Sequence, residues 1–441
     1  MKAYVSGTLL LLFLFFVPAI HAKTNRDTLA RTVLSEDANE SAAAIAELRA
    51  AGPEGLKILL QVYQQEIDQQ LDGAAPSLQW QRLSAALDAV SQQKDSYRSG
   101  LYWYTDLDKA KSAARTSGKP ILSLRLLGNL SDEFSCANSR FFRTVLYSNA
   151  AVSEVLRDGF ILHWKSVRPA PKVTIDFGDG RKLQGTITGN SIHYVLSADG
   201  QILDALPGLY GPQAFLRSLA GIQELNERLK GLNFTARAGV LYEYHRAAVK
   251  SLTSNWLSDA KQAGGKIPES LIPGSKTGGT RRAIEIAPVA VTKMITEIEI
   301  LRAITRDSDE LGKLTDEATW TKIALQHLQD AKLDDRSIGL IRRQTASLLA
   351  AKDGSGRTPE VKLTNLLQKL QLSIALDTVR NEYMMHTKLH AWLTAAWTRN
   401  DLEQFNEKVY SELFLTPKTD PWLGLFSPET YMALERSGVS P

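Results

Sequence analysis

The chain has 441 residues, of which 52 are Lys or Arg and 48 are Asp or Glu, so its formal net charge is only +4. This near-neutral balance, together with the lack of a zinc-finger or helix-turn-helix signature, argues against a nucleic-acid partner. A single cysteine excludes an internal disulfide framework, so stability must come from packing, and a chain of this length has enough residues for two or three cores.

Residues 1–22 have the layout of a secretory signal peptide. A basic residue, Lys2, is followed by an apolar run over residues 9–17, a helix breaker at Pro18 and a small residue at Ala22. Because this apolar core is too short to anchor the chain stably in a bilayer, we expect cleavage after Ala22. The mature chain is then exported, periplasmic or secreted, and has no membrane span. A retained signal anchor is the alternative, since the residue three before the cut is less typical than alanine.

Residues 23–97 carry a helical pattern. Apolar side chains recur at spacings of three and four residues on both sides of a break at Gly52-Pro53. This spacing predicts amphipathic helices, and we expect a short N-terminal helical region. The apolar positions are Ile45, Leu48, Leu56, Leu59, Leu60 and Tyr63.

Helical and strand-like segments alternate over residues 98–225. Asp106 is placed to cap a helix over 107–117, which Gly118-Lys119-Pro120 ends before a strand-like run over 121–127. Strands that are joined by helices predict an α/β layer structure, in which function gathers at the carboxyl ends of parallel strands. The further elements predicted here are helices over 136–147, 150–157 and 213–225, strands over 160–164, 192–196 and 202–206, and a hairpin of 173–177 with 182–187.

Residues 226–441 are almost entirely helical in pattern and predict a large C-terminal α-helical domain. A loop at 263–280 contains seven Gly or Pro residues and is predicted to be an exposed, mobile connection. Its sequence Gly274-Ser275-Lys276-Thr277 lacks the spacing of a phosphate-binding loop and follows no predicted strand. A second loop is predicted over 352–358, and the tail over 417–441 is expected to pack back onto the helices through its apolar residues.

The only cysteine, Cys136, lies at the predicted start of a helix. Unpaired backbone N–H groups and the positive end of the helix dipole favour thiolate over thiol at such a position. Arg140 and Arg143, one and two turns further on, would add to that bias. Ser139 stands where a second cysteine would complete a dithiol pair, so the site cannot form an internal disulfide. The Ser139 hydroxyl would instead stabilise the thiolate by hydrogen bonding.

Four segments between residues 101 and 225 follow a recognisable order. They are Lys119-Pro120-Ile121-Leu122, Cys136-Ala137-Asn138-Ser139-Arg140-Phe141-Phe142, the stretch from Val152 to Trp164, and the closing stretch from Asp199 to Leu216. Together they resemble the thioredoxin superfamily, in particular its exported thioredoxin-like members, over less than a third of the chain. The resemblance implies a thioredoxin-like central domain over 98–225, flanked by the short N-terminal helical region (23–97) and the large C-terminal helical domain (226–441).

Three positions depart from the pattern of this superfamily. Ser139 replaces the resolving cysteine, Ser135 stands where an aromatic residue usually precedes the first cysteine, and Ile192 aligns with the cis-proline beside the thiol. In the superfamily that proline helps to hold the substrate backbone against the sulfur. The resemblance therefore implies a single-thiol site of the CxxS type rather than a full dithiol cycle. The same alignment puts His193 near Cys136, where it would act as the base that activates the thiol.

A single thiolate can still attack a disulfide or react with an oxidant, because nucleophilicity needs only the thiolate and access to it. We therefore predict that Cys136, with Ser139 and His193, captures or reduces a protein or a low-molecular-weight thiol or disulfide partner. An external thiol would then resolve the product, and no cofactor is predicted. The alternative is a buried, inert cysteine in a non-catalytic thioredoxin-fold binding or scaffold protein of the cell envelope. An accessible, acidic thiol would favour the first hypothesis, and a buried, unreactive one the second.

A second group of candidate residues lies in the C-terminal helical domain. Glu382, His386 and His390 follow one another at steps of four residues and would share one face of a helix. Two histidines at this spacing can hold zinc or another divalent ion, with Glu382 as a third ligand. The residue after His386 is not the glutamate that marks a metalloprotease helix. The alternative, which the sequence favours, is a polar helical face supported by charge pairs of Arg380 and Lys388.

Overall fold

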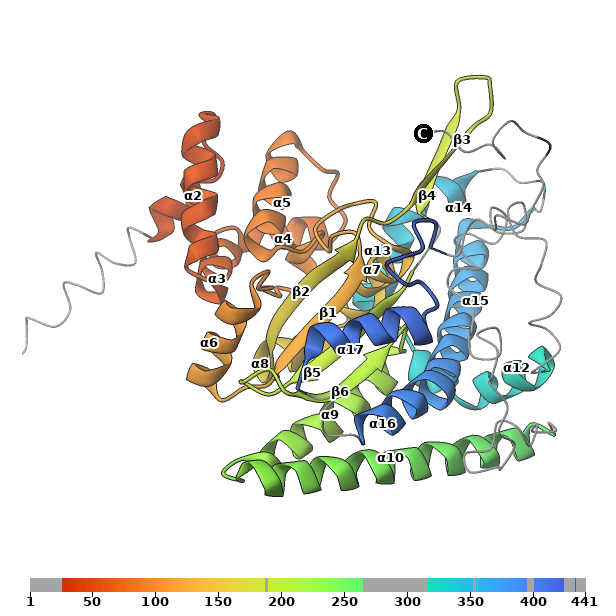
Figure 1. Cartoon of the computed structure of the whole chain (residues 1–441). Helices are drawn as coiled ribbons and strands as arrows, with labels where there is room; N and C mark the ends of the chain where they lie inside the picture. Colours follow the sequence, from red (N-terminus) through yellow and green to blue (C-terminus); the bar gives the residue numbers. More distant parts are fainter. Residues whose placement is uncertain are drawn as a thin grey trace, which may run out of the picture. The chain divides into compact units, whose positions relative to one another are not determined.

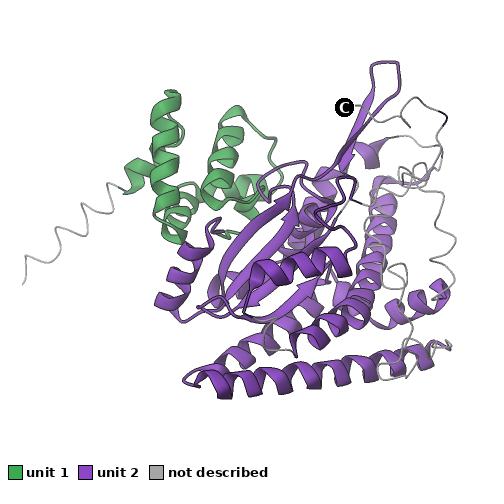
Figure 2. Ribbon diagram, in the orientation of Figure 1, with its two compact units in different colours: residues 1–102 green, residues 103–441 purple. Residues whose placement is uncertain are grey.

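The chain divides into two compact units, residues 1–102 and 103–441 (Figure 2). The predicted boundary at 225/226 lies inside the second unit. The predicted signal peptide, most of the loop at 263–280 and most of the tail at 417–441 lie outside the described residues. The computed structural model describes residues 26–186, 189–264, 316–351, 354, 356–394, 400–423 and 433.

The first unit is helical, as its apolar spacing predicts. Asp37 accepts hydrogen bonds from two backbone N–H groups at the start of one helix, and Ser77 does the same from one N–H group at the start of another. Leu48, Leu59 and Leu87 are buried in a core that belongs to this unit. Its elements are a helix over 26–32, α2 (Ala38–Ala50), α3 (Pro53–Val62), α4 (Gln64–Leu71), α5 (Leu78–Ser91) and η1 (Ser96–Arg98).

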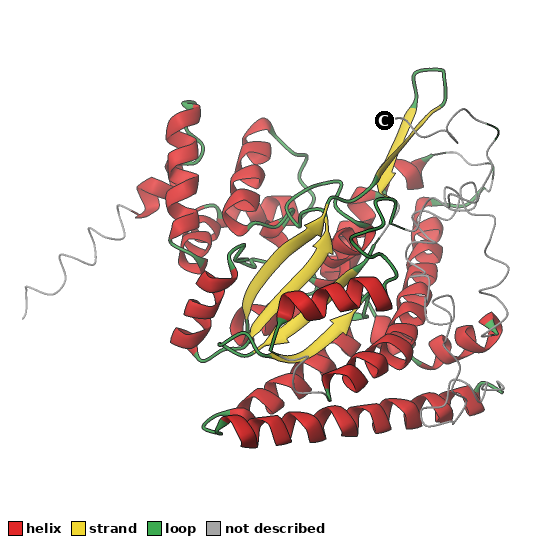
Figure 3. Cartoon of the chain, in the orientation of Figure 1, coloured by secondary structure: helices red, strands yellow, loops and turns green. Residues whose placement is uncertain are grey.

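A four-stranded sheet lies within the second unit (Figure 3), and its strand order is β2-β1-β5-β6. Strand β1 (Ile121–Leu127) runs parallel to β2 (Ile161–Arg168) and antiparallel to β5 (Ser191–Leu196), which is in turn antiparallel to β6 (Ile202–Pro207). Every residue of β1, β5 and β6 is buried, which is typical of a sheet covered on both faces. The four strands predicted from the sequence are confirmed, and the observed β2 continues four residues beyond its predicted end.

Helices form most of the rest of the second unit's described residues. Asp106 caps the predicted helix, which ends where Gly118 adopts a φ of 70°, so both predicted ends are confirmed. The helix predicted over 136–147 is instead one short α-helix followed by a π-helical turn. No helix among the described residues combines the length and the apolar content needed to cross a bilayer. The elements are α6 (Leu107–Ser117), α7 (Ala137–Phe141), η2 (Phe142–Leu146), α8 (Ala150–Gly159), α9 (Pro212–Leu229), α10 (Phe234–Gln262), α12 (Glu317–Gln326), η6 (Leu328–Ala331), α13 (Asp335–Gln344), α14 (Ala346–Ala350), α15 (Pro359–Arg380), η7 (Asn381–His386), α16 (Thr387–Leu393), α17 (Leu402–Lys408) and η9 (Val409–Leu413).

The two faces of the sheet pack against different helices. Tyr194 of β5 lies against α17, where its ring centroid is 6.2 Å from that of Phe405. The preceding residue, His193, contacts the opposite layer, with its ring 4.7 Å from Phe142 of η2 and 5.2 Å from Phe215 of α9. This division follows from the two-residue period of a strand. Figure 1 shows α17 lying across one face of the sheet.

A separate hairpin, β3 (Lys172–Asp176) with β4 (Lys182–Thr186), extends away from the four-stranded sheet (Figure 1). The Asp176 side chain accepts a hydrogen bond from the N–H of Gly178 at 2.9 Å, and Gly178 adopts a φ of 75° that favours glycine. The hairpin predicted from the Gly-Asp-Gly turn is therefore confirmed.

Candidate functional site

Cys136 lies at the N-terminal end of α7, at the end of the loop that follows β1. Its φ and ψ of −58° and 161° are non-helical, and its carbonyl accepts a hydrogen bond from the N–H of Arg140 at 3.2 Å. The side chain is 0 % exposed. Burial raises the pKa of the Cys136 thiol, and the N–H of Ser139 and the charge of Arg140 offset only part of this rise. The thiol therefore lies at the predicted helix start, but burial outweighs the helix-dipole effect that favours thiolate.

Ser139 and His193, the predicted partners of the thiol, have other hydrogen-bond partners. The Ser139 hydroxyl accepts a hydrogen bond from the Ser135 hydroxyl at 2.8 Å. Nε2 of His193 lies 2.7 Å from the hydroxyl oxygen of Tyr147, and burial lowers the pKa of His193 to about 3. His193 is therefore neutral and bonded to Tyr147, whereas the predicted general base would bond to Cys136. Burial also raises the pKa of Tyr147, so its hydroxyl is neutral.

A carboxylate and two histidines meet in the interior of the second unit. Oδ1 of Asp204, on β6, lies 3.0 Å from Nε2 of His386 and 3.8 Å from Nδ1 of His390. The two imidazole rings are stacked, with centroids 4.1 Å apart. All three side chains are buried, and among the described residues they are the one set of His, Cys, Asp or Glu compact enough to hold a metal ion. Two of the three candidate residues, His386 and His390, thus lie together, and Asp204 takes the place that the sequence suggested for Glu382.

Two residues of α10 extend this set. The Tyr244 hydroxyl donates a hydrogen bond to Oδ2 of Asp204 at 2.6 Å, and Nδ1 of His245 lies 2.8 Å from Nδ1 of His390. Although burial opposes it, the neighbouring histidines hold the pKa of Asp204 well below its usual value, so the carboxylate is charged. We call Asp204, Tyr244, His245, His386 and His390 the Asp204 centre.

Glu382, the third ligand predicted from the sequence, lies outside the compact set. The prediction assumed an α-helix, in which residues four apart share a face. Glu382 and His386 instead lie in η7, a π-helical turn, which holds more residues per turn and shifts that alignment. Burial raises the pKa of Glu382, and its carboxylate interacts with the charges of His386 and Arg217. Asp204, rather than Glu382, supplies the carboxylate of the set.

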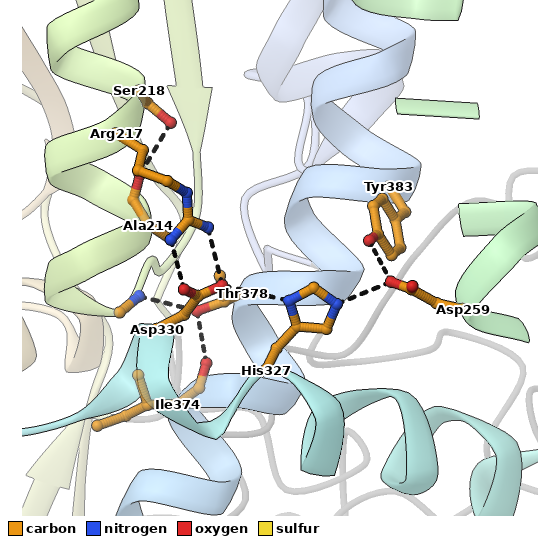
Figure 4. A network of polar contacts seen from close by, with 10 residues as sticks. Ala214, Arg217, Ser218, Asp259, His327, Asp330, Ile374, Thr378 and Tyr383 are labelled. Atoms are coloured by element: carbon orange, nitrogen blue, oxygen red, sulfur yellow. Dashed lines mark hydrogen bonds and ion pairs between the residues drawn. The ribbon is translucent and has the colours of Figure 1, made fainter. Parts of the chain in front are cut away.

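A second polar network surrounds His327 (Figure 4). Its Nε2 lies 2.7 Å from Oδ2 of Asp259 and its Nδ1 lies 3.3 Å from Oδ2 of Asp330. Arg217 donates two hydrogen bonds to Asp330, and the Tyr383 hydroxyl donates one to Asp259. The hydrogen bond with Asp330 and the nearby charge of Asp259 raise the pKa of His327 to about 9, so the ring is protonated at neutral pH.

Sequence reasoning missed three members of the Asp204 centre, namely Asp204, Tyr244 and His245. The local signal for Asp204 is a carboxylate in the middle of the apolar run Ile202-Leu203-Asp204-Ala205-Leu206, where a charge is costly unless it has partners. His245 has no comparable signal, because it lies on a long helix 145 residues before its partner His390.

Comparisons with family models, with curated proteins and with solved structures find no match to this chain. A function is therefore inferred from the geometry of these sites.

Proposed function

We propose that the second unit contains a thioredoxin-like domain with a structural cysteine, and that this exported protein is a non-catalytic binding or scaffold protein. The strand arrangement supports the thioredoxin-like assignment. Two parallel strands, β1 and β2, are followed by the antiparallel β5 and β6 and a closing helix, α9, and Cys136 stands between the parallel pair. Because a fold does not define a function, the environment of the thiol decides between the two hypotheses.

The complete burial of Cys136 is the observation that carries this proposal. Thiol–disulfide exchange needs a thiolate that a partner can reach. Burial prevents a partner from reaching the sulfur and also raises the pKa of the thiol. Both the access and the fraction of thiolate are therefore reduced. Ile192, which aligns with the substrate-binding proline of the superfamily, is itself fully buried in β5.

Two hydrogen bonds tie the residues near Cys136 to β4 and β5. The Thr186 hydroxyl donates to the carbonyl of Ser135, next to the cysteine, at 3.0 Å. On the other side, the Asn138 amide donates to the hydroxyl of Ser191 at 2.8 Å. The atoms that form these bonds are buried, so breaking the bonds would leave buried polar groups without partners. Capture or reduction of a partner by Cys136 would require the buried sulfur to become exposed.

The experiment is to incubate the chain with oxidised glutathione and to measure the mixed disulfide by intact mass. We expect no adduct on the folded chain over a period in which the urea-unfolded chain is fully modified. Cys136→Ser is the matched control, because it removes the sulfur and keeps a small polar side chain. An adduct that forms on the folded wild type as fast as on the unfolded chain would support the single-thiol hypothesis and contradict this proposal.

A further inference from the structure

The Asp204 centre brings metal-binding atoms together from three separate parts of the chain. Asp204 comes from β6, His245 from α10, and His386 and His390 from consecutive turns at η7 and α16. Imidazole nitrogens with a carboxylate oxygen form a donor set that suits zinc and related transition metals. Among the described residues, Asp204, His386 and His390 are the one set of His, Cys, Asp or Glu whose ligand atoms all lie within 4.8 Å of one another.

The spacing of these atoms fits a tetrahedral ion. With metal–nitrogen and metal–oxygen bonds of about 2.0–2.2 Å, tetrahedral ligand atoms lie about 3.3 Å from one another. Oδ1 of Asp204 is 3.0 Å from Nε2 of His386 and 3.8 Å from Nδ1 of His390, which brackets that value. Nδ1 of His245 is 2.8 Å from Nδ1 of His390 but lies outside the compact set of three, so this ring would have to move toward the ion to take the fourth position.

The carboxylate has the outer hydrogen bonds expected of a metal ligand. The N–H of Ala205 donates to Oδ1 of Asp204 at 2.7 Å, and the Tyr244 hydroxyl donates to Oδ2 at 2.6 Å. Such bonds fix the orientation of a ligating carboxylate before the ion arrives. Oδ1 also contacts Nε2 of His386 at 3.0 Å, and the ion would replace this contact.

The charge of the centre also favours a cation. Asp204 is 1 % exposed, and among the described residues its ion-pair partners are His386 and His390 rather than a lysine or an arginine. A buried charge is usually paired or bound to a metal ion. A divalent ion at this position would lie beside a buried carboxylate that has no lysine or arginine partner among the described residues.

We propose that Asp204, His386 and His390, with His245 in the fourth position, bind one transition-metal ion of the zinc class. Because all four side chains are buried, the site is closed and structural rather than catalytic. The ion would join α10 and α16 to β6, and so fasten the C-terminal helices to the sheet. This inference is independent of the proposed function, since Cys136 belongs to neither the donor set nor its outer shell.

The first experiment uses the wild-type full chain. The chain is stripped with a chelator, loaded with zinc chloride, freed of unbound ion by gel filtration and analysed for metal content and thermal unfolding. We expect about one zinc per chain and a higher Tm than that of the stripped chain. The same chain loaded with cobalt should show the visible absorption of tetrahedral Co²⁺. A folded chain that retains no zinc and whose Tm is unchanged by zinc would overturn the proposal.

Variants then test the assignment of the ligands. Asp204→Asn and His386→Ala should lose zinc, whereas Tyr244→Phe, which removes only an outer hydrogen bond, should weaken zinc affinity by about 10–100-fold. His327→Gln is the matched control, because it removes a histidine outside the centre and should keep full binding. Folding is checked by circular dichroism, and if a ligand variant does not fold, Tyr244→Phe decides. Unchanged affinity in Tyr244→Phe, or equal loss in His327→Gln, would contradict the site.

Discussion

Replacing His327 with glutamine should remove a pH-dependent contribution to the stability of the second unit. His327 lies between the carboxylates of Asp259 and Asp330 (Figure 4), and its side chain is 26 % exposed. Its pKa is about 9 in the folded chain, against an ordinary value of 6.5. Since one pKa unit corresponds to about 1.4 kcal/mol, the protonated ring stabilises the fold by up to about 3 kcal/mol.

The stabilisation by protonated His327 is present only over a defined range of pH. The folded pKa of His327 lies above the unfolded value, so the contribution is complete below pH 6.5 and is lost as the pH rises through about 9. Asp330 behaves in the opposite way, because its folded pKa of about 2 lies below the ordinary 3.8, so its contribution is lost only in strong acid. Between pH 6 and 9.5, titration of His327 therefore dominates this pair. Arg217, Tyr383 and the other neighbours of His327 are common to wild type and variant.

Urea unfolding followed by tryptophan fluorescence measures this contribution. The rings of Trp256 on α10 and Trp320 on α12 stack with their centroids 6.3 Å apart. Asp259 also lies on α10, and His327 directly follows α12, so these tryptophans are close to the network in the chain. The free-energy difference between wild type and His327→Gln should be largest at pH 6 and should shrink by up to about 3 kcal/mol by pH 9.5. Gln326→Ala, an exposed neighbour, is the control and should show no such trend. A difference for His327→Gln that is the same at both pH values would refute the reasoning.

Two further predictions concern a close backbone contact and a buried charge. A Cβ on Gly55 would lie 1.9 Å from the carbonyl oxygen of Leu48, so Gly55→Ala should destabilise the first unit by about 1–3 kcal/mol. Gly239→Ala, on an open face of α10, should instead leave stability unchanged or raise it by about 0.5–1 kcal/mol, and equal effects of the two changes in thermal unfolding would contradict the packing argument. Arg125 is 1 % exposed and its Nη2 lies 2.8 Å from Oε1 of Glu403, so Glu403→Gln should cost about 1–3 kcal/mol by leaving a buried charge. Arg125→Met removes that charge and should cost less, and a larger loss than for Glu403→Gln in urea unfolding would count against this account.

Local sequence signals were sufficient for much of the fold. The Asp106 cap and the Gly118 end predict α6 to the residue, because both act through hydrogen bonds and φ values within one turn. The strand over 121–127 is likewise predicted to the residue, since a strand buried on both faces is a continuous apolar run with turn signals at its ends. The π-helical turn after α7 was not predicted, because no local signal in its residues distinguishes it from an α-helix.

The candidate sites depend on contacts that the sequence does not display. The helix start at Cys136 is a local feature and was predicted, but the burial that raises its pKa is a tertiary property that no residue near it in the sequence signals. The histidines of the Asp204 centre were predicted as a pair from their spacing. Their carboxylate was not, because Asp204 and His386 are 182 residues apart and meet only when the helices after β6 pack onto it. A sequence pattern shows which face of a helix or strand is apolar, whereas tertiary packing decides which faces contact one another.

The most direct test of the central claim is the rate of Cys136 alkylation in the folded chain as a function of pH. Free cysteine, with a pKa of about 8.5, is the reference. The buried thiol should react far more slowly than this reference at every pH at which the chain is folded, and at the reference rate once urea unfolds the chain. Rapid modification of the folded chain with an apparent pKa well below 8.5 would show an accessible thiolate and would contradict the account of a structural cysteine.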